Sequence, residues 1–250
     1  MTSTTTSPRT VLITGGTSGI GLATAREMLK RGARVMVLGR NEERLHKALA
    51  ELRPLGRVEG LSLDVSSDSD MKRMADETIA RFGRIDSLVA CAASGGSHAR
   101  ARNLPFSVAQ MPVEDWDEVM GINLKGIIYS NKAVIPAMTE HGGGTIINVS
   151  SARGGRYGLP MAAAYAASKR AIVGFSEVLE QDLREHGIRV EVVFPDVTET
   201  PMMSITGGIT PDGMMKPATV AVLIADMVLS PDDTLYVDPV IAPFGGWQLG

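Results

Sequence analysis

The hydrophobic positions of this chain fall into short continuous runs separated by longer amphipathic stretches. The runs are Val11–Ile13, Val35–Leu38, Leu61–Leu63, Leu88–Cys91, Ile146–Val149, Val190–Phe194, and Tyr236–Val237 with Val240–Ile241. Strands buried on both faces read as continuous apolar runs, and their alternation with helices indicates a parallel sheet. Gly32, Gly83 and Gly187 each follow an amphipathic stretch and predict helix ends. The pattern predicts an α/β Rossmann fold, a doubly wound parallel sheet with helices on both faces.

No repeat or linker divides the chain, so residues 9–250 are expected to form one domain. Residues 1–8 are polar and rich in Ser and Thr, and they lack the apolar segment of a secretory signal peptide. They predict a flexible tail. The irregular stretches 94–112 and 195–217 follow predicted strands at the edge where open α/β sheets bind ligands. We expect these stretches to line or cover a substrate pocket.

Charge and cysteine content narrow the class of protein. The chain has 25 basic and 28 acidic residues and a net charge of −3, with no block of like charges. This balance argues against binding to nucleic acid or to an anionic membrane. Cys91 is the single cysteine, no Cys/His cluster has metal-binding spacing, and no apolar run is long enough to span a membrane. The sequence predicts a soluble, cytoplasmic protein without a metal.

A glycine-rich turn follows the first apolar run. Val11–Ile13 leads into Thr14-Gly15-Gly16-Thr17-Ser18-Gly19-Ile20-Gly21 and then into an amphipathic stretch. Glycines between a strand and a helix allow backbone N–H groups to approach a pyrophosphate closely. The turn therefore predicts a dinucleotide site in the first βα unit.

A tyrosine and a lysine lie one helical turn apart in the Ala-rich segment Tyr165-Ala166-Ala167-Ser168-Lys169. Residues four apart share a helix face. A neighbouring ammonium lowers the pKa of a phenol, and a phenol so adjusted can exchange the proton of a carbonyl/alcohol interconversion. Tyr165 is therefore a candidate general acid/base.

Five motifs follow one another along the chain. They are Thr14-Gly-x-x-x-Gly19-Ile-Gly21, Asp64-Val65, Asn123-Leu-Lys-Gly126, Ile147-Asn148-Val149-Ser150-Ser151 and Tyr165-x-x-x-Lys169. Their order and approximate spacing resemble those of the classical short-chain dehydrogenase/reductase family, from Thr10 to about Gly246. The resemblance implies one domain, residues 9–250, that binds a nicotinamide cofactor.

The resemblance also implies roles for four catalytic residues. Tyr165 would protonate the nascent alkoxide, and Lys169 would bind the nicotinamide ribose and lower the pKa of Tyr165. Ser151 would donate a hydrogen bond to the substrate oxygen. Asn123 would support a water chain that resupplies protons through Lys169.

The spacing between serine and tyrosine departs from the family's usual interval of thirteen. Thirteen residues before Tyr165 stands Ala152, which cannot donate, whereas Ser151 stands fourteen before it. We interpret this as a one-residue insertion within residues 153–161 and keep Ser151. Ser150 is interpreted as a structural hydroxyl at the strand end.

Further positions are expected to hold the cofactor. Ala90-Cys91-Ala92-Ala93 replaces the family's Asn-Asn-Ala-Gly, which makes Cys91 an inert buried thiol, and Pro195-Asp196 replaces its Pro-Gly, so that Asp196 faces either the nicotinamide or the substrate. The predicted cofactor-binding residues are Gly15, Thr17, Ser18, Gly19, Ile20, Gly21, Arg40, Asp64, Val65, Cys91, Ala92, Tyr165, Lys169, Pro195, Val197, Thr198 and Thr200.

The end of the second predicted strand favours NADP(H). An acidic residue there binds the ribose of NAD, whereas an arginine accommodates a 2′-phosphate. Here Val37-Leu38 is followed by Gly39-Arg40, without a carboxylate. Arg40 can pair with the phosphate in bidentate fashion. The alternative is that Arg40 is a solvated residue opening the next helix.

These observations predict an NADPH-dependent ketoreductase that acts on a small carbonyl compound, such as a polyketide-like or other secondary-metabolite ketone. Two alternatives remain: an NAD-linked alcohol dehydrogenase working in the oxidative direction, and a non-catalytic cofactor-binding regulator. The resemblance further implies a homotetramer or homodimer, built through the helices that contain Asn123 and Tyr165 and through the C-terminal segment.

Overall fold

A parallel sheet forms the centre of the protein in a computed structural model that describes residues 8–97, 106–205, 213–231 and 233–243. The sheet has seven strands in the order β3-β2-β1-β4-β5-β6-β7. The strands are β1 Thr10–Thr14, β2 Arg34–Gly39, β3 Val58–Ser62, β4 Ser87–Ala90, β5 Gly144–Val149, β6 Ile188–Pro195 and β7 Val240–Ile241. The order reverses between β1 and β4, as in doubly wound folds. The predicted fold class is confirmed.

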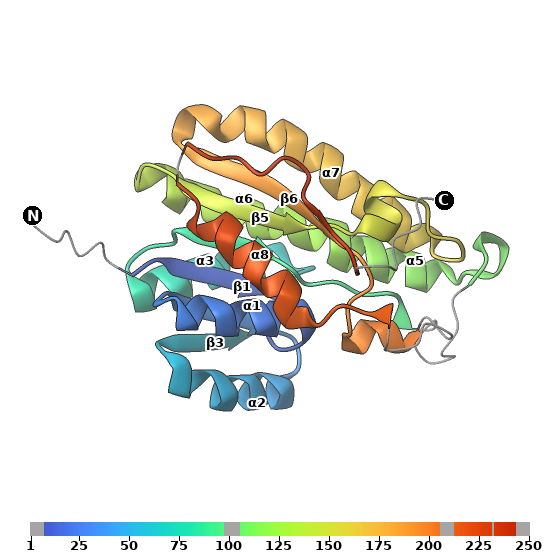
Figure 1. Cartoon of the computed structure of the whole chain (residues 1–250), viewed down its shortest axis with the longest axis horizontal. Helices are drawn as coiled ribbons and strands as arrows, with labels where there is room; N and C mark the ends of the chain where they lie inside the picture. Colours follow the sequence, from blue (N-terminus) through green and yellow to red (C-terminus); the bar gives the residue numbers. More distant parts are fainter. Residues whose placement is uncertain (1–7, 98–105, 206–212, 232, 244–250) are drawn as a thin grey trace, which may run out of the picture.

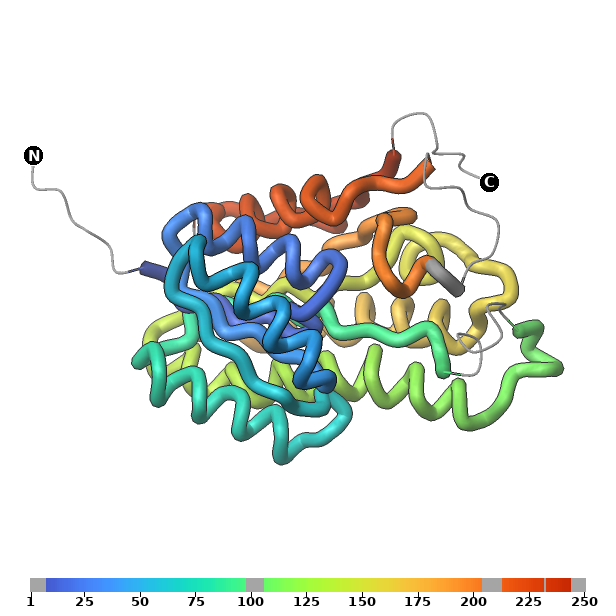
Figure 2. Tube along the Cα trace, turned by 90° about the horizontal axis from the view of Figure 1, so that it is seen from below, coloured from blue at the N-terminus to red at the C-terminus, as the bar shows by residue number. Residues whose placement is uncertain are grey.

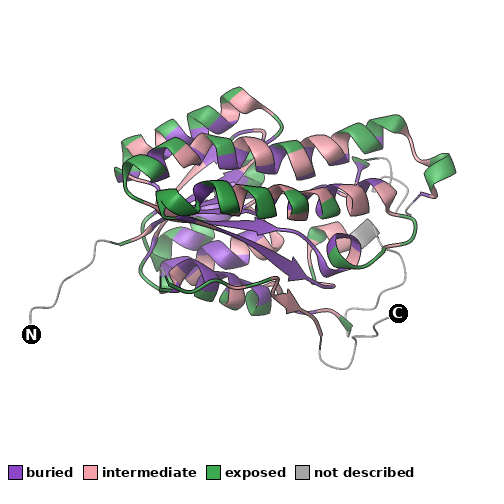
Figure 3. Cartoon of the chain, turned by 90° about the horizontal axis from the view of Figure 1, so that it is seen from above, coloured by how far each residue is buried: buried purple, intermediate pink, exposed green. Residues whose placement is uncertain are grey.

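Helices cover both faces of the sheet (Figure 1). On one face lie α1 Gly19–Lys30, α2 Glu42–Leu52 and α8 Pro217–Leu229, whose apolar side chains form one buried core with β1 and β2. On the other lie α3 Asp68–Phe82, α6 Gly126–Glu140 and α7 Ala163–Leu183, which form a second core. Figure 2 shows the two helix layers edge-on, and Figure 3 shows the buried strands between them.

Shorter elements connect these layers. The helix α5 Val113–Val119 runs into the π-helical segment η3 Met120–Lys125, and a second π-type segment, η4 Ala152–Arg156, follows β5. The 3₁₀ helices are η1 Arg53–Leu55, η2 Val108–Gln110, η5 Arg184–His186 and η6 Pro201–Ile205. The segments after β5 and β6, yellow and orange in Figure 1, gather at the carboxyl ends of the strands.

The predicted helix ends agree with the structure. Gly32, Gly83 and Gly187 have φ angles of 83°, 86° and 69°, the left-handed conformation that glycine adopts without strain. At the other end of α2, the Asn41 side chain accepts a hydrogen bond from the Arg44 backbone N–H at 2.8 Å. This cap fixes where α2 begins beside the β1–α1 turn.

Two strands differ most from their predicted bounds. β3 begins at Val58, three residues before the predicted run, because an edge strand has one neighbour and tolerates polar residues such as Glu59. Tyr236 and Val237 lie outside β7. The Tyr236 backbone N–H instead donates to the Glu191 side chain.

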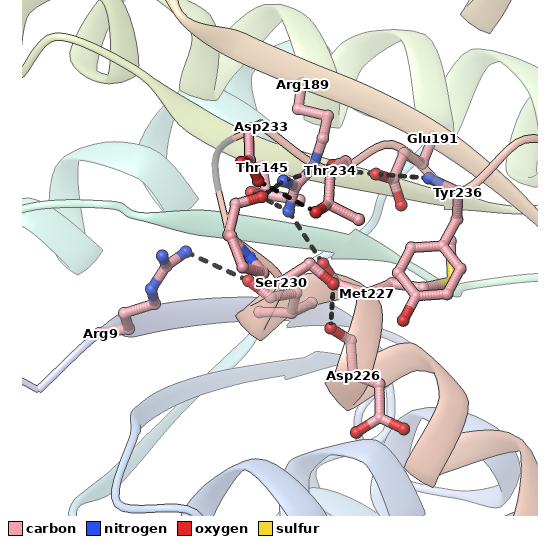
Figure 4. Close-up of polar contacts among 12 residues, drawn as sticks. Arg9, Thr145, Arg189, Glu191, Asp226, Met227, Ser230, Asp233, Thr234 and Tyr236 are labelled. Carbon is pink, nitrogen blue, oxygen red and sulfur yellow. Dashed lines mark hydrogen bonds and ion pairs between the residues drawn. The ribbon is translucent and has the colours of Figure 1, made fainter.

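Arg189 of β6 fixes the segment that follows α8 (Figure 4). Its guanidinium donates to the carbonyl oxygens of Met227, Pro231 and Thr234 at 2.8 to 2.9 Å. Its Nε lies 2.9 Å from a carboxylate oxygen of Glu191, whose pKa burial raises to about 7. Arg189 thus caps the C-terminal end of α8 and directs the chain toward β7.

Candidate active site

A cavity of about 600 Å³ opens at the carboxyl ends of the strands. Its lining comes from the β1–α1 turn, the end of β4, the β5–α7 connection, α7 itself and the segment after β6. Among the predicted site residues it collects Gly15, Ser18, Gly19, Ile20, Gly21, Cys91, Ala92, Ser151, Tyr165, Lys169, Pro195, Val197, Thr198 and Thr200. The glycine turn and the tyrosine/lysine pair, far apart in sequence, therefore share one cavity.

The glycine turn leaves no room for side chains. A Cβ on Gly21 would lie 2.4 Å from the Gly15 carbonyl oxygen, and one on Gly15 would lie 2.9 Å from the Ala92 Cα. The Thr14 hydroxyl accepts the backbone N–H groups of Cys91 and Ala92 at 3.1 and 3.2 Å, which ties the turn to the end of β4. This close-packed backbone at the start of α1 matches what pyrophosphate binding requires.

Cys91 lies in the cavity wall and is partly buried rather than fully enclosed. Burial raises the pKa of its thiol to about 11, so that the sulfur is protonated near neutral pH. This agrees with the expectation of an inert thiol.

Four predicted cofactor residues lie outside the cavity lining, namely Thr17, Arg40, Asp64 and Val65. The Val65 side chain is buried in the core beneath α6, where a Cβ on Gly126 would meet it at 2.8 Å. Arg40 is 53% exposed, and its Nη1 lies 3.8 Å from an oxygen of Asp64. Arg40 and Asp64 thus form an ion pair outside the cavity lining, just after the ends of β2 and β3.

Arg44, which was not among the predicted site residues, lines the cavity together with Ser18 and Gly19. Arg44 lies in the first turn of α2, and the Asn41 cap orients that turn. The sequence signal that could have indicated Arg44 is Asn41, a helix-capping residue three positions before it, which places Arg44 in the first turn of a helix. Arg44 of α2 therefore stands near the glycine turn, and Arg40 lies in the short connection that precedes α2.

Tyr165 and Lys169 share one face of α7, and the Lys169 Nζ lies 5.7 Å from the centre of the Tyr165 ring. Lys169 is 2% exposed and donates from Nζ to the Val149 carbonyl oxygen at 2.8 Å. Burial lowers the pKa of Lys169 to about 8. The lysine thus loses its charge close to physiological pH.

Burial raises the pKa of Tyr165, and a hydrogen bond with the Ser151 hydroxyl opposes that rise. We expected Lys169 to lower the pKa of this phenol. In the structure Ser151 is the group that does so, and Lys169 bonds to Val149 instead. The raised pKa keeps the phenol protonated at neutral pH, the state that a proton donor needs.

The two serines at the end of β5 have different partners. Ser150 donates to the Lys169 carbonyl oxygen at 2.8 Å and is enclosed, because a Cβ on Gly155 would lie 2.3 Å from its Oγ. Ser151 forms a hydrogen bond with Tyr165, and both serines line the cavity. The geometry brings Ser151 to the tyrosine and bonds Ser150 to the backbone of α7, and the roles expected of the two serines stay predictions.

Asn123 occupies the π-helical segment η3 and is fully buried. Its amide accepts from the Ser94 N–H at 2.7 Å and donates to the Ser94 carbonyl and to the Ser168 hydroxyl at 3.0 and 3.2 Å. Ser168 in turn donates to the Tyr165 carbonyl at 2.8 Å. Asn123 thus joins the segment after β4 to the helix turn that carries Tyr165, which the sequence did not reveal.

Charged and apolar side chains share the wall around Tyr165. Arg153 of η4 forms an ion pair with Asp196, with Nε 2.7 Å from Oδ1. The apolar residues that line the cavity include Phe106, Met111, Val119, Leu159, Met161, Met202 and Met203. The predicted substrate segments 94–112 and 195–217 thus do contribute to the cavity, although residues 98–105 and 206–212 lie outside the described part of the chain, as do residues 1–7 of the predicted tail.

Within the described residues, no group of three or more His, Cys, Asp and Glu side chains could hold a metal ion. In the same part of the chain, none of the helices is both long enough and apolar enough to cross a bilayer.

Comparisons with known proteins agree with this geometry. A family model described as short chain dehydrogenase matches residues 9–207. The chain is 40% identical over 194 residues to a Streptomyces coelicolor protein provisionally named a ketoacyl reductase, and the match covers 76% of this chain and 71% of the relative.

Solved structures show the same fold. A single-substitution variant of an actinorhodin polyketide ketoreductase, solved with NADPH, is 32% identical, with a TM-score of 0.85 over 96% of this chain and 97% of that chain. A 3-ketoacyl-(acyl-carrier-protein) reductase from Brucella melitensis complexed with NADH is 25% identical, with a TM-score of 0.84 over 93% and 96%.

Proposed function

Because the chain belongs to the short-chain dehydrogenase family, we propose that it is an NADPH-dependent ketoreductase in which Tyr165 acts as general acid. The observation that carries the proposal is the contact between Ser151 and Tyr165, with Lys169 one turn away, in the same cavity as the glycine turn. We further propose that residues 9–250 form one NADP(H)-binding domain.

The residues present fit a nicotinamide dinucleotide. The glycine turn and the start of α1 would hold the pyrophosphate, and Lys169 would bind the nicotinamide ribose. Cys91, Ala92 and the segment Pro195–Thr200 would flank the nicotinamide. The bound cofactor supplies the hydride that reduces the carbonyl carbon.

The residues around the tyrosine would handle the negative charge that develops on the substrate oxygen. Ser151 donates a hydrogen bond to that oxygen and holds it beside the phenol. The O–H of Tyr165 then passes its proton to the oxygen and yields the alcohol. Asn123 would support resupply of the proton to Tyr165 through Lys169. The Asn123 side chain would contribute to this task by its position, since it is bonded to Ser94 and to Ser168 of the helix that carries Lys169.

We propose NADPH as the cofactor because Arg40 and Arg44 stand on the β2–α2 side, without a carboxylate at Gly39. Guanidinium groups bind phosphate through paired N–H donors. The solved relative with NADPH supports this choice, while the relative with NADH keeps the NAD-linked alternative in view.

The alternatives differ in what they require of the site. An NAD-linked alcohol dehydrogenase needs a deprotonated phenol to accept the alcohol proton, and burial raises the pKa of Tyr165. The raised pKa therefore fits a phenol that donates a proton, as reduction requires. A cofactor-binding regulator would not need Ser151, Tyr165 and Lys169 together in one cavity.

We also propose a cytoplasmic homotetramer or homodimer. Exposed apolar residues on α5 and α7 support assembly through these helices: Val113, Trp116 and Val178 are 69%, 37% and 59% exposed. Ile172 and Leu183, by contrast, are buried against the sheet and are not available to a partner.

The test measures NADPH oxidation over a panel of ketones, with Tyr165→Phe as the control for the chemical step. Turnover by the wild type and its loss in the variant are expected, with the NADPH dissociation constant unchanged. Cofactor binding without turnover of any ketone would favour the regulator.

A further inference from the structure

Arg153 and Asp196 form a charged pair inside a cavity wall that is otherwise largely apolar. The pair joins η4 to the residue after β6, with the Arg153 Nε 2.7 Å from the Asp196 Oδ1. The Asp196 side chain is 1% exposed and the Arg153 side chain 44% exposed, so that the carboxylate lies beneath the guanidinium. The pair has no counterpart where the family carries Pro-Gly, because glycine has no side chain.

The backbone on both sides of the pair is fixed. The Asp196 N–H donates to the Ile241 carbonyl at 2.8 Å, and the Asp196 carbonyl accepts from the Thr198 hydroxyl at 2.8 Å. The Tyr157 N–H donates to the Ala152 carbonyl at 2.9 Å and closes the loop that carries Arg153. The guanidinium is therefore held in place before a ligand arrives.

The loop also places Arg153 beside the candidate acid. Its neighbour Gly154 packs against the Tyr165 ring, since a Cβ on Gly154 would lie 3.2 Å from that ring. Both Arg153 and Tyr165 line the cavity. A ligand whose reacting oxygen meets Tyr165 can therefore reach Arg153 with a group a few bonds away.

The pairing leaves hydrogen-bonding capacity unused on both partners. A guanidinium that served only to tie the loop down would bond both carboxylate oxygens, the favoured geometry of such pairs. Here one contact is made through Nε, and the buried Asp196 Oδ2 has no partner among the described residues. An unpaired buried oxygen is unfavourable and uncommon. In the described part of the chain Arg153 has this one side-chain hydrogen bond, so that the edge formed by Nη1 and Nη2, with two parallel donors, is available.

We propose that Arg153, oriented by Asp196, binds a second oxygen of the substrate and selects carbonyl compounds that carry a carboxylate, ester or further carbonyl group near the reacting carbon. This inference rests on the proposed ketoreductase function and names the substrate class of that site. The free edge of the guanidinium matches two oxygen lone pairs. Burial of Asp196 beneath it offsets the positive charge, so that a neutral oxygen can bind as well as an anionic one.

The test compares substrates of equal chain length that differ by the presence of an ester group. Ethyl 3-oxobutanoate is paired with heptan-2-one, and ethyl 4-oxopentanoate with octan-2-one, which have equal chain lengths. The carboxylate 4-oxopentanoate, which corresponds to the second ester, tests an anionic substrate. Intrinsic reactivity differs within each pair, so the quantity of interest is the change in the ratio of kcat/KM between variant and wild type.

Arg153→Met combined with Asp196→Asn removes the guanidinium without leaving a buried charge unpaired. The ester-to-ketone ratio should fall roughly tenfold or more, mainly through a higher KM for the ester, as expected for loss of a hydrogen bond to a charged group. Arg156→Met is the matched control, because Arg156 pairs with Asp238 at 2.9 Å and lies outside the cavity lining. It should leave the ratio unchanged. A larger fall for 4-oxopentanoate than for its ester identifies the second oxygen as a carboxylate.

An unchanged ratio for both chain lengths and for the acid, in a double variant with wild-type melting temperature, would overturn the proposal. So would a weaker NADPH dissociation constant with no change in the ratio, which would assign the pair to the cofactor. If the wild type binds NADPH and reduces none of the five compounds, the proposed function itself fails. If it reduces them without a change in the ratio, only the role of Arg153 fails.

Discussion

The two walls of the cavity recognise their ligands by different means. The wall made by the β1–α1 turn consists of backbone and small residues, packed so closely that a Cβ on Gly21 would lie 2.4 Å from another carbonyl oxygen. The wall made by α7 and the segments after β5 and β6 presents side chains that carry charge or a proton, including Tyr165, Lys169 and Arg153. Substitution should therefore act through shape at the first wall and through chemistry at the second.

Tyr165→Phe should give the largest effect, because it removes the proton donor and keeps the ring packed. We expect kcat to fall roughly 100- to 10,000-fold, the range typical of general acid catalysis, while the NADPH dissociation constant stays within twofold or so. Steady-state kinetics and fluorescence titration of NADPH measure both. Retention of most of kcat would remove the phenol from the mechanism.

Substitution of the two serines at the end of β5 tests the side-chain wall further. Ser151→Ala should lower kcat roughly 100-fold or more, since one donor to a developing oxyanion is lost. Ser150→Ala should lower the melting temperature and leave kcat nearly unchanged, because its hydroxyl bonds to the Lys169 backbone. The reverse order of effects on kcat would contradict the proposed insertion after Ser151.

Gly21→Ala tests the backbone wall. The added methyl group cannot be accommodated without moving the Gly15 carbonyl, so we expect NADPH affinity to fall by roughly one to two orders of magnitude from a strain of about 1–3 kcal/mol. Gly213→Ala is a suitable control, since a Cβ there meets nothing within 4 Å. Equal affinities in the two variants would show that close packing of the turn is not needed.

The pH dependence of kcat/KM tests the charge of Lys169 in the side-chain wall. Burial lowers the pKa of Lys169 to about 8, so its charged form prevails below that pH and disappears above it. If the charge supports catalysis, kcat/KM for reduction should drop about tenfold between pH 7 and pH 9, as one protonation equilibrium requires. A flat profile over this range would exclude a role for the charge of Lys169.

Arg40→Ala should have the smallest effect. Arg40 is about half exposed, and contacts to solvated charges contribute little, so we expect roughly a fivefold loss of NADPH affinity with NADH affinity retained. Adding Arg44→Ala should enlarge the loss for NADPH. A carboxylate at Gly39 is a poor alternative test, because a Cβ there would lie 2.6 Å from the Thr17 hydroxyl. Equal losses for both cofactors would count against NADPH.

The sequence predicted those parts of the molecule that depend on local pattern. Continuous apolar runs located the buried strands, and glycines with left-handed conformations marked the helix ends. The edge strand β3 was predicted to start too late in the chain because one of its faces is polar, which removes the continuous run. The family motifs indicated Tyr165 and Lys169, whose close approach the structure shows.

The contacts that the sequence could not predict join residues far apart in the chain. The pairing of Arg153 with Asp196, and that of Asn123 with Ser94 and Ser168, depend on how segments pack after folding. Arg44 was missed because its importance comes from the orientation of α2 beside another turn. Side-chain periodicity indicates which face of an element is buried, but it does not indicate which residue of another element packs against that face.

The hydrogen bond between the Ser94 N–H and the Asn123 side chain should slow hydrogen exchange at Ser94. The Ser94 N–H lies in a segment without regular secondary structure, yet it is buried and bonded at 2.7 Å to an amide that is itself anchored on α7. The Ser94 N–H can exchange with deuterated water only when η3, α7 and the end of β4 separate. The Ser94 amide should therefore keep its proton about as long as the central strands do, and its exchange would report the integrity of the active site.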